Sequence, residues 1–167
     1  ESCRDLLENF GGHTYAAGLS LKEENLDAFT QRFLKLAADE IIPEQMTPQI
    51  DIDAVLDLQD INSKFMSELK KMNPFGPDNQ KPVFCSLGVK DYGTSKLVGK
   101  DLEHIKLELI DDKSNTPIHG IAFGMRQHNT HIKNMKPFNI CYTIEENTYN
   151  GNTSLQLMVK DIKENDI

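Results

Sequence analysis

The spacing of apolar residues in the first part of the chain predicts two helices. A short one follows Ser2, which can cap it, and the pair Gly11-Gly12 ends it. A longer one is predicted from about residue 23 to 41, where apolar residues recur near helical spacing: Leu26, Phe29, Phe33, Leu34, Ala37 and Ile41. Residues 42–49 contain two prolines and indicate a linker. This part is typical of half an α/β unit.

Beyond the linker the pattern changes to the alternation of β-strands. Residues 50–55 alternate, and a helix predicted over 62–72 stops at Asn73-Pro74. Asn150-Gly151 predicts a tight hairpin, because both residues tolerate positive φ. Further strands are predicted at 83–90, 95–98, 104–110, 118–123, 138–145 and 154–162. Short strands at this density predict a small antiparallel barrel of OB-like size.

Composition indicates an ordinary globular protein. The 167 residues are 38% hydrophobic and 26% charged. No apolar run approaches the roughly 20 residues of a membrane span, and the first ten residues lack the pattern of a signal peptide. We therefore expect a soluble, cytoplasmic protein without a membrane partner. Cys3, Cys85 and Cys141 lie far apart, which predicts neither a disulfide framework nor a zinc site.

The net charge of -8 argues against a nucleic-acid partner at first, because phosphates are bound by Lys and Arg. The middle of the chain departs from this average. Between residues 81 and 136, nine basic residues stand against six acidic ones: Lys81, Lys90, Lys96, Lys100, Lys106, Lys113, Arg126, Lys133 and Lys136 against Asp91, Asp101, Glu103, Glu108, Asp111 and Asp112. This segment could follow a nucleic-acid backbone, although ordinary solvated lysines give the same pattern.

The segment from Gly11 to Gly18 is the strongest local motif. Consecutive glycines can turn backbone N–H groups toward one concavity, and a helical turn beginning near His13 would add its own unpaired N–H groups, which together suit a phosphate. The imidazole of His13 can donate to a phosphate oxygen. The alternative is a helix C-cap followed by a tight turn with a packed histidine.

Two motifs in the chain resemble those of a known family. The string GGHTYAAGLSL is similar to the GGHxxAAG signature of the DHH-associated domain in DHH-family phosphoesterases, and ESCRDLLENF resembles the helix before it in RecJ-type exonucleases. The string NPFGPDNQKPVF resembles the NPFGxGNxxPxF segment that opens the OB-like domain of the same exonucleases. Asp78 replaces the second glycine of this motif, a change that a left-handed Asp can accommodate.

The resemblance implies an α+β chain in two parts. Residues 1–45 would be the C-terminal part of an α/β DHH-associated domain, and residues 46–167 an OB-like antiparallel β-barrel that binds nucleic acid. The parent protein would be a hydrolase, an exonuclease that degrades single-stranded DNA from 5′ to 3′ in DNA repair and recombination. The fragment would bind and position the strand.

The resemblance also assigns roles and partners. Gly11, Gly12 and His13 would contact the phosphate near the scissile bond, with His13 catalytic. Manganese or magnesium would be held by the N-terminal DHH domain of the parent, so we expect no metal or other cofactor in this fragment and no activity from it alone. Besides single-stranded DNA and the DHH domain, a single-strand-binding protein is an expected partner.

In the predicted barrel, a DNA strand needs cations along its backbone and faces on which bases stack. The candidate cationic residues are Lys96, Lys100, His104, Lys106 and Arg126. Tyr92 or Phe123 could be the stacking platform, although Phe123 lies in an apolar strand pattern typical of a core residue. His128 and His131 lie in a polar stretch and are expected to be solvated rather than metal ligands.

Two other functions remain open from the sequence. One is another DHH-family phosphodiesterase, acting on short oligonucleotides or cyclic dinucleotides. The other is a noncatalytic adaptor whose OB-fold binds protein, which the acidic total favours.

Overall fold

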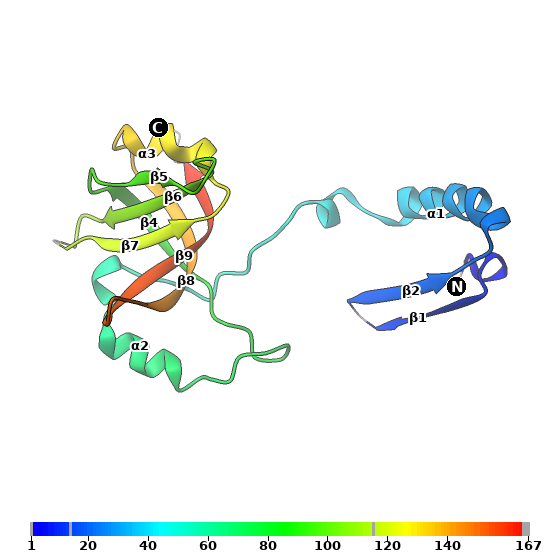
Figure 1. The fold of residues 1–167 in the computed structure, drawn as a ribbon, viewed down its shortest axis with the longest axis horizontal. Coiled ribbons are helices and arrows are strands. Elements are labelled where there is room, and N and C mark those ends of the chain that lie inside the picture. The colour runs from blue at the N-terminus through cyan, green and yellow to red at the C-terminus, as the bar shows by residue number, and fades with distance from the viewer. Residues whose placement is uncertain (1, 14, 115, 165–167) are drawn as a thin grey trace. The chain divides into compact units, whose positions relative to one another are not determined.

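A short antiparallel hairpin and one long helix form the first of two units in the computed structural model, which describes residues 2–13, 15–114 and 116–164 (Figure 1). This unit is Glu1–Ile50. Its helix α1 is Leu26–Glu40, and its strands are β1, Asn9–His13, and β2, Ala16–Ser20. Three 3₁₀ turns complete it: η1, Arg4–Leu6; η2, Glu23–Asn25; and η3, Pro43–Met46.

The helix predicted after Ser2 is wrong. Only η1 is helical there, and Gly11 and Gly12 lie inside β1 instead of ending a helix. Pairing across the hairpin overrides the local apolar spacing, because β1 and β2 place small residues opposite one another, Gly11 with Gly18 and Gly12 with Ala17. Glycine is also a poor helix former. The second predicted helix is confirmed by η2 and α1.

The first unit has almost no core of its own. Among its described residues only Cys3 is buried, and α1 buries none of its side chains. Phe33 and Leu34 on α1 are 55% and 62% exposed. A two-stranded hairpin is only marginally stable alone. Exposed apolar patches mark contact surfaces, so the apolar sides of the hairpin and of α1 are suited to packing against other protein.

The second unit, Asp51–Ile167, is built on a curled seven-stranded sheet. The strand order is β3-β4-β8-β9-β7-β6-β5, and β4 also pairs with β6. The strands are β3, Ala54–Val55; β4, Phe84–Asp91; β5, Lys96–Val98; β6, His104–Ile110; β7, Ile118–Ala122; β8, Phe138–Tyr149; and β9, Asn152–Glu164.

Short helices lie at the ends of this sheet. Figure 1 shows α3, Asn129–Lys133, at one end and α2, Ser63–Lys70, at the other, near the tip of the long β8–β9 hairpin. An ion pair of 2.7 Å between Lys70 Nζ and Glu146 Oε1 joins α2 to β8. Two 3₁₀ turns precede the helices: η4, Leu58–Asp60, and η5, Arg126–His128.

The strands predicted from residue 83 onward are found, whereas only Ala54–Val55 of the alternating residues 50–55 forms a strand. The pairing also differs from the prediction in one respect. The sheet is not wholly antiparallel, because β3–β4 and β7–β9 are parallel pairs. The hairpin at Asn150-Gly151 is confirmed, with φ of 49° and 80° at the two residues. Its ladder continues to Tyr149 and Asn152, so both strands are longer than the alternation predicted.

The core lies against one face of the curled sheet. Strand β6 alternates strictly, with Ile105, Leu107 and Leu109 fully buried and Lys106 exposed between them. Tyr142 on β8 is also fully buried, and its hydroxyl shares a 2.7 Å hydrogen bond with Ser86 Oγ. Burial raises the pKa of Tyr142 far above the usual tyrosine range, because the phenolate would be desolvated.

The segment that resembles NPFGxGNxxPxF forms a tight turn held by Asn79. Its side-chain amide donates to the carbonyls of Met72 and Pro74, at 2.7 and 2.9 Å. Gly76 and Asn79 also exchange backbone hydrogen bonds. Asp78 does not have positive φ, so the turn does not depend on the left-handed conformation expected at this position.

Asp91 at the end of β4 is a fully buried carboxylate. It accepts a hydrogen bond of 3.1 Å from the Ser95 backbone N–H and one of 3.4 Å from Lys133 Nζ on α3. Burial acts to raise the pKa of Asp91, but the hydrogen bonds from Ser95 and the Gly93 backbone and the charge of Lys133 outweigh it and hold this pKa below the usual range. Asp91 thus ties β4, the start of β5 and α3 together.

We expect Asp91→Asn to lower the free energy of unfolding by about 2 kcal/mol at neutral pH, because the ionised carboxylate has partners that an amide cannot satisfy equally. Since the pKa is lowered in the folded state, this contribution is present above the unfolded Asp pKa of about 3.9 and is lost as pH falls through the folded value. Urea unfolding of both proteins at neutral and acidic pH measures it. A stability difference that grows on acidification would contradict the assignment.

Candidate functional site

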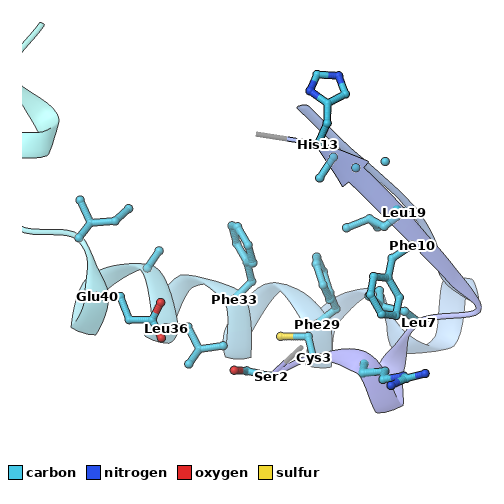
Figure 2. Close-up of a pocket in the computed structure, with 17 residues that line it drawn as sticks. Ser2, Cys3, Leu7, Phe10, His13, Leu19, Phe29, Phe33, Leu36 and Glu40 are labelled. Atoms are coloured by element: carbon cyan, nitrogen blue, oxygen red, sulfur yellow. The ribbon is translucent and has the colours of Figure 1, made fainter. Parts of the chain in front are cut away.

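A hollow of about 680 Å³ lies in the first unit between its hairpin and α1. Figure 2 shows Phe10 and Leu19 of the hairpin and Phe29 and Phe33 of α1 around it, with His13 at the far end of β1. Phe29 and Phe33 stack with ring centroids 5.6 Å apart. Most side chains around this hollow are apolar, and its apolar part suits contact with protein; Gly11, Gly12 and His13 also line it.

Gly12 is required by the close approach of the two strands. A Cβ at this position would lie 2.6 Å from the Ala16 carbonyl oxygen and 2.8 Å from Ala17 Cα, both of them backbone atoms. A Cβ at Gly11 would meet nothing within 4 Å. The two glycines of the motif therefore have different structural roles.

His13 ends β1 and is exposed. Its Nδ1 accepts a 3.2 Å hydrogen bond from the Tyr15 backbone N–H, which places the ring hydrogen on Nε2, where it can donate to a ligand. The interpretation of the motif as a helix C-cap with a packed histidine is wrong, and so is the helical turn expected near His13. A phosphate contact from Gly11, Gly12 and His13 stays a prediction.

The second unit carries a hollow of about 530 Å³ on the outer face of its sheet. Five strands contribute to it, because residues that face outward on neighbouring strands lie in register: Lys106 opposite Ile121, His119 opposite Gln156, and Asn147 opposite Ser154. We call this hollow the groove. Its lining is Val98, Lys106, His119, Ile121, Asn147, Tyr149, Ser154 and Gln156.

Two lysines lie directly opposite each other beside the groove. Lys96 on β5 pairs in register with Lys106 on β6, and both are exposed. Like charges directly across a strand pair are destabilising. Among the residues that the structure describes, no carboxylate forms an ion pair with Lys96, Lys100 or Lys106. An anion bound between Lys96 and Lys106 would relieve their repulsion.

Two carboxylates that pair in register with lining residues of the groove do have partners. Glu145, opposite Gln156, forms an ion pair of 2.7 Å with Lys81. Glu108, opposite His119, accepts a hydrogen bond from Thr94 Oγ1 and lies 3.5 Å from His119 Nδ1. The residues that line the groove include the cation Lys106 and no carboxylate, although the chain as a whole is acidic.

The other candidate cations lie around the β5–β6 turn. Lys100 is exposed in this turn, and Arg126 Nη1 donates a hydrogen bond of 3.4 Å to the Asp101 carbonyl oxygen in the same turn. His104 accepts a hydrogen bond from the Gly124 N–H at Nδ1, and its Nε2 lies 3.3 Å from Glu103 Oε1. The structure thus brings the five candidates to one region, with His104 already engaged at both nitrogens.

The predicted core position of Phe123 is wrong. Its side chain is 55% exposed and meets the His104 ring edge-on, with centroids 4.9 Å apart. Tyr92 is also exposed, at 51%, but neither ring lines the groove. The aromatic residue that does is Tyr149, which is 74% exposed.

Sequence reasoning missed Tyr149 and its neighbours in the groove. The hairpin signal at Asn150-Gly151 could have placed Tyr149 on the same face as Asn147, since strand residues two apart share a face. The pairing of His119 with Gln156 could not be predicted from the sequence, because the parallel pairing of β7 with β9 leaves no pattern in the residues around either strand.

His128 and His131 are not solvated as expected. Nδ1 of each lies close to a different oxygen of Glu164, at 2.9 Å from Oε1 for His128 and 3.1 Å from Oε2 for His131. These contacts tie η5 and α3 to the end of β9. The described residues contain no group of three or more His, Cys, Asp or Glu side chains that could hold a metal ion.

Several observations together define the class of the second unit. A curled sheet with a β8–β9 hairpin, a parallel β7–β9 contact and an open outer groove is the architecture of an OB-fold domain. A family model described as the RecJ OB domain matches residues 52–161. The chain belongs to this RecJ OB domain family.

Curated relatives extend the similarity over nearly the whole chain. The single-stranded-DNA-specific exonuclease RecJ of Bacillus subtilis (strain 168) is 29% identical over 160 residues, which are 95% of this chain and 20% of that protein. RecJ of Salmonella typhimurium (strain LT2) is 28% identical over 158 residues, 95% of this chain and 27% of the relative. The chain therefore spans between a fifth and just over a quarter of these relatives.

A solved structure shows the same fold. The crystal structure of RecJ in complex with Mn²⁺ from Thermus thermophilus has a TM-score of 0.76 and 21% sequence identity, and the match covers 99% of this chain and 23% of that one. Within the residues described for this chain, no helix is long and apolar enough to cross a membrane.

We expect Gly12→Ala to disrupt the β1–β2 hairpin, because the added methyl group would overlap backbone atoms of β2. Gly11→Ala is the matched control and should be tolerated, since its Cβ meets open space. Amide hydrogen exchange of β1 and β2 checks this, with fast exchange expected for Gly12→Ala alone. Equal protection in the two variants would mean that the strands do not pack as described.

Proposed function

We propose that this chain is the C-terminal part of a RecJ-type exonuclease, a hydrolase that degrades single-stranded DNA from 5′ to 3′, and that this part binds and positions the strand. Membership of the RecJ OB domain family supports the proposal, as do the relatives, whose names state an exonuclease specific for single-stranded DNA. DNA repair and recombination in the cytoplasm are the corresponding process and location.

The observation that carries the DNA-binding role is the opposed pair Lys96 and Lys106. Two lysines in register, without a carboxylate partner among the described residues, make a site for a phosphate of the backbone. Lys100 and Arg126 extend the positive surface around the β5–β6 turn. His104 contributes mainly by supporting Phe123, because both ring nitrogens already have partners.

The proposal also assigns a role to the first unit. Residues 1–45 are the C-terminal part of an α/β DHH-associated domain, and residues 46–167 are the OB-like domain. Other parts of the parent protein, including its N-terminal DHH domain, would cover the apolar hollow beside α1. The near absence of a core in this unit supports the arrangement, because its apolar side chains need a partner.

Manganese or magnesium would be held elsewhere in the parent protein. The crystal structure from Thermus thermophilus is a complex of RecJ with Mn²⁺, whereas the described residues of this chain offer no cluster of metal-ligating side chains. This chain alone is therefore proposed to lack exonuclease activity. Its contribution to catalysis would come from His13, with Nε2 donating to a phosphate oxygen beside Gly11 and Gly12. A single-strand-binding protein is a proposed further partner.

The double variant Lys96→Ala/Lys106→Ala should bind single-stranded DNA more weakly and with a smaller salt dependence. Each phosphate contact on a single strand contributes about 0.7 to the slope of log affinity against log salt, so the loss of the one phosphate held between the two lysines should reduce the slope by about 0.7. Fluorescence anisotropy with a labelled oligonucleotide at several salt concentrations measures this slope. Lys64→Ala, on α2, is the control that keeps it unchanged.

An unchanged slope in a folded double variant would place the DNA path elsewhere. Failure of the unmodified chain to bind oligonucleotide at low salt would favour a protein-binding adaptor instead.

In the full-length parent enzyme, we expect His13→Ala to lower kcat about 10²-fold to 10³-fold, with a much smaller effect on DNA binding. A donor that contacts the phosphate more strongly in the transition state acts on the chemical step. Single-turnover cleavage of a 5′-labelled strand measures the rate, and Tyr15→Phe is a control that keeps the backbone hydrogen bond to Nδ1. A lowered melting temperature with a normal single-turnover rate would assign His13 a purely structural role.

A further inference from the structure

Two of the three cysteines lie directly opposite each other in the second unit, although they are far apart in the sequence. Cys85 on β4 pairs in register with Cys141 on the antiparallel strand β8, and both thiols are free. The irregularity of this ladder falls between Ser86 and Val89, so the pairing at the two cysteines is regular.

The backbone of Cys85 shows which kind of cross-strand pair this is. Its carbonyl oxygen accepts a 2.8 Å hydrogen bond from the Leu56 N–H, at the end of β3, and therefore points away from β8. Opposed residues of an antiparallel ladder either exchange two backbone hydrogen bonds or exchange none. Cys85 and Cys141 thus form a non-hydrogen-bonded pair, in which the Cα atoms are about 4.5 Å apart and the side chains are closest. Disulfides join Cα atoms that are roughly 4.4–6.8 Å apart, so the backbone can accept a bond between these two sulfurs without rearrangement.

The two thiols lie on the face of the sheet that does not carry the Ser86–Tyr142 hydrogen bond. Ser86 and Tyr142 adjoin the cysteines along their strands and meet in the core, and successive strand residues point to opposite faces. Cys85 and Cys141 are nonetheless only 7% and 8% exposed. Burial raises the pKa of both thiols, so they are protonated and slow to react at neutral pH. We therefore expect a small oxidant to reach them more readily than a bulky thiol reagent.

We propose that Cys85 and Cys141 form an oxidisable dithiol, which hydrogen peroxide converts to a reversible disulfide between β4 and β8. One sulfur attacks a peroxide oxygen, the O–O bond breaks, and a sulfenic acid forms with release of water. The other sulfur then attacks the sulfenic sulfur, the S–S bond forms, and a second water leaves. The two thiols lose two electrons and two protons in total, which reduce one peroxide to two waters. A small dithiol reductant restores both thiols by exchange.

The disulfide would stabilise the second unit, because it closes a long loop of the unfolded chain, residues 85–141. We expect the melting temperature of this unit to rise by roughly 10 °C on oxidation. The function proposed above does not depend on this site, and this site does not depend on DNA binding.

The test treats the whole unmodified chain with hydrogen peroxide, blocks the remaining thiols in denaturant, and maps the cysteine peptides by mass spectrometry. We expect one intramolecular disulfide that joins the peptides of Cys85 and Cys141, with Cys3 left as a free thiol. Dithiothreitol should reverse both the disulfide and the rise in melting temperature.

Variants of the three cysteines are matched controls. Cys3→Ser should form the disulfide and show the same rise, whereas Cys85→Ala and Cys141→Ala should show neither. Peptide mapping of the unmodified chain decides the pairing even where an alanine variant does not fold.

The site would be overturned by two free thiols at Cys85 and Cys141 after oxidation, by sulfinic acid at either position, or by pairing with Cys3 or between chains. A Cys85–Cys141 disulfide that leaves the melting temperature unchanged would overturn its stabilising role.

Discussion

The two-sided pairing of β9 is the interaction on which the second unit depends. This strand pairs antiparallel with β8 through the hairpin and parallel with β7, which lies far from it in the sequence. The parallel contact brings His119 and Ile121 beside Gln156 and turns three strands into one continuous outer face. It also covers the core on the inner side, where Leu157 is fully buried opposite Gly120. The same hydrogen bonds therefore stabilise the fold and create the groove.

The arrangement of charged side chains around the groove, rather than the net charge of the chain, determines what this surface can bind. The chain carries a formal charge of -8, yet Glu145 forms an ion pair with Lys81 and Glu108 accepts a hydrogen bond from Thr94. The lysines of β5 and β6 have no such partners among the described residues. An acidic domain can thus present a cationic face to DNA while its remaining surface repels nonspecific contact with nucleic acid.

Local alternation predicted the strands well, because their burial follows a period of two. The predicted bounds of β6 are those observed, and the turn at Asn150-Gly151 was correct. The helix predicted after Ser2 failed because the pairing of small residues in β1 and β2 overrode the apolar spacing before Gly11. Contacts that join distant segments, such as His119 with Gln156, depend on strand register and could not be derived locally. The site roles inferred from resemblance stay predictions.

The two-residue turn of the β8–β9 hairpin limits how this domain can change in length. Successive strand residues point to opposite faces, so one residue inserted between Asn147 and Tyr149 would turn the Tyr149 ring away from Asn147 and toward the other side of the sheet. Two inserted residues would restore its direction and move it outward along the hairpin. Natural variants of this hairpin that keep the groove should therefore differ in length by even numbers of residues on each strand.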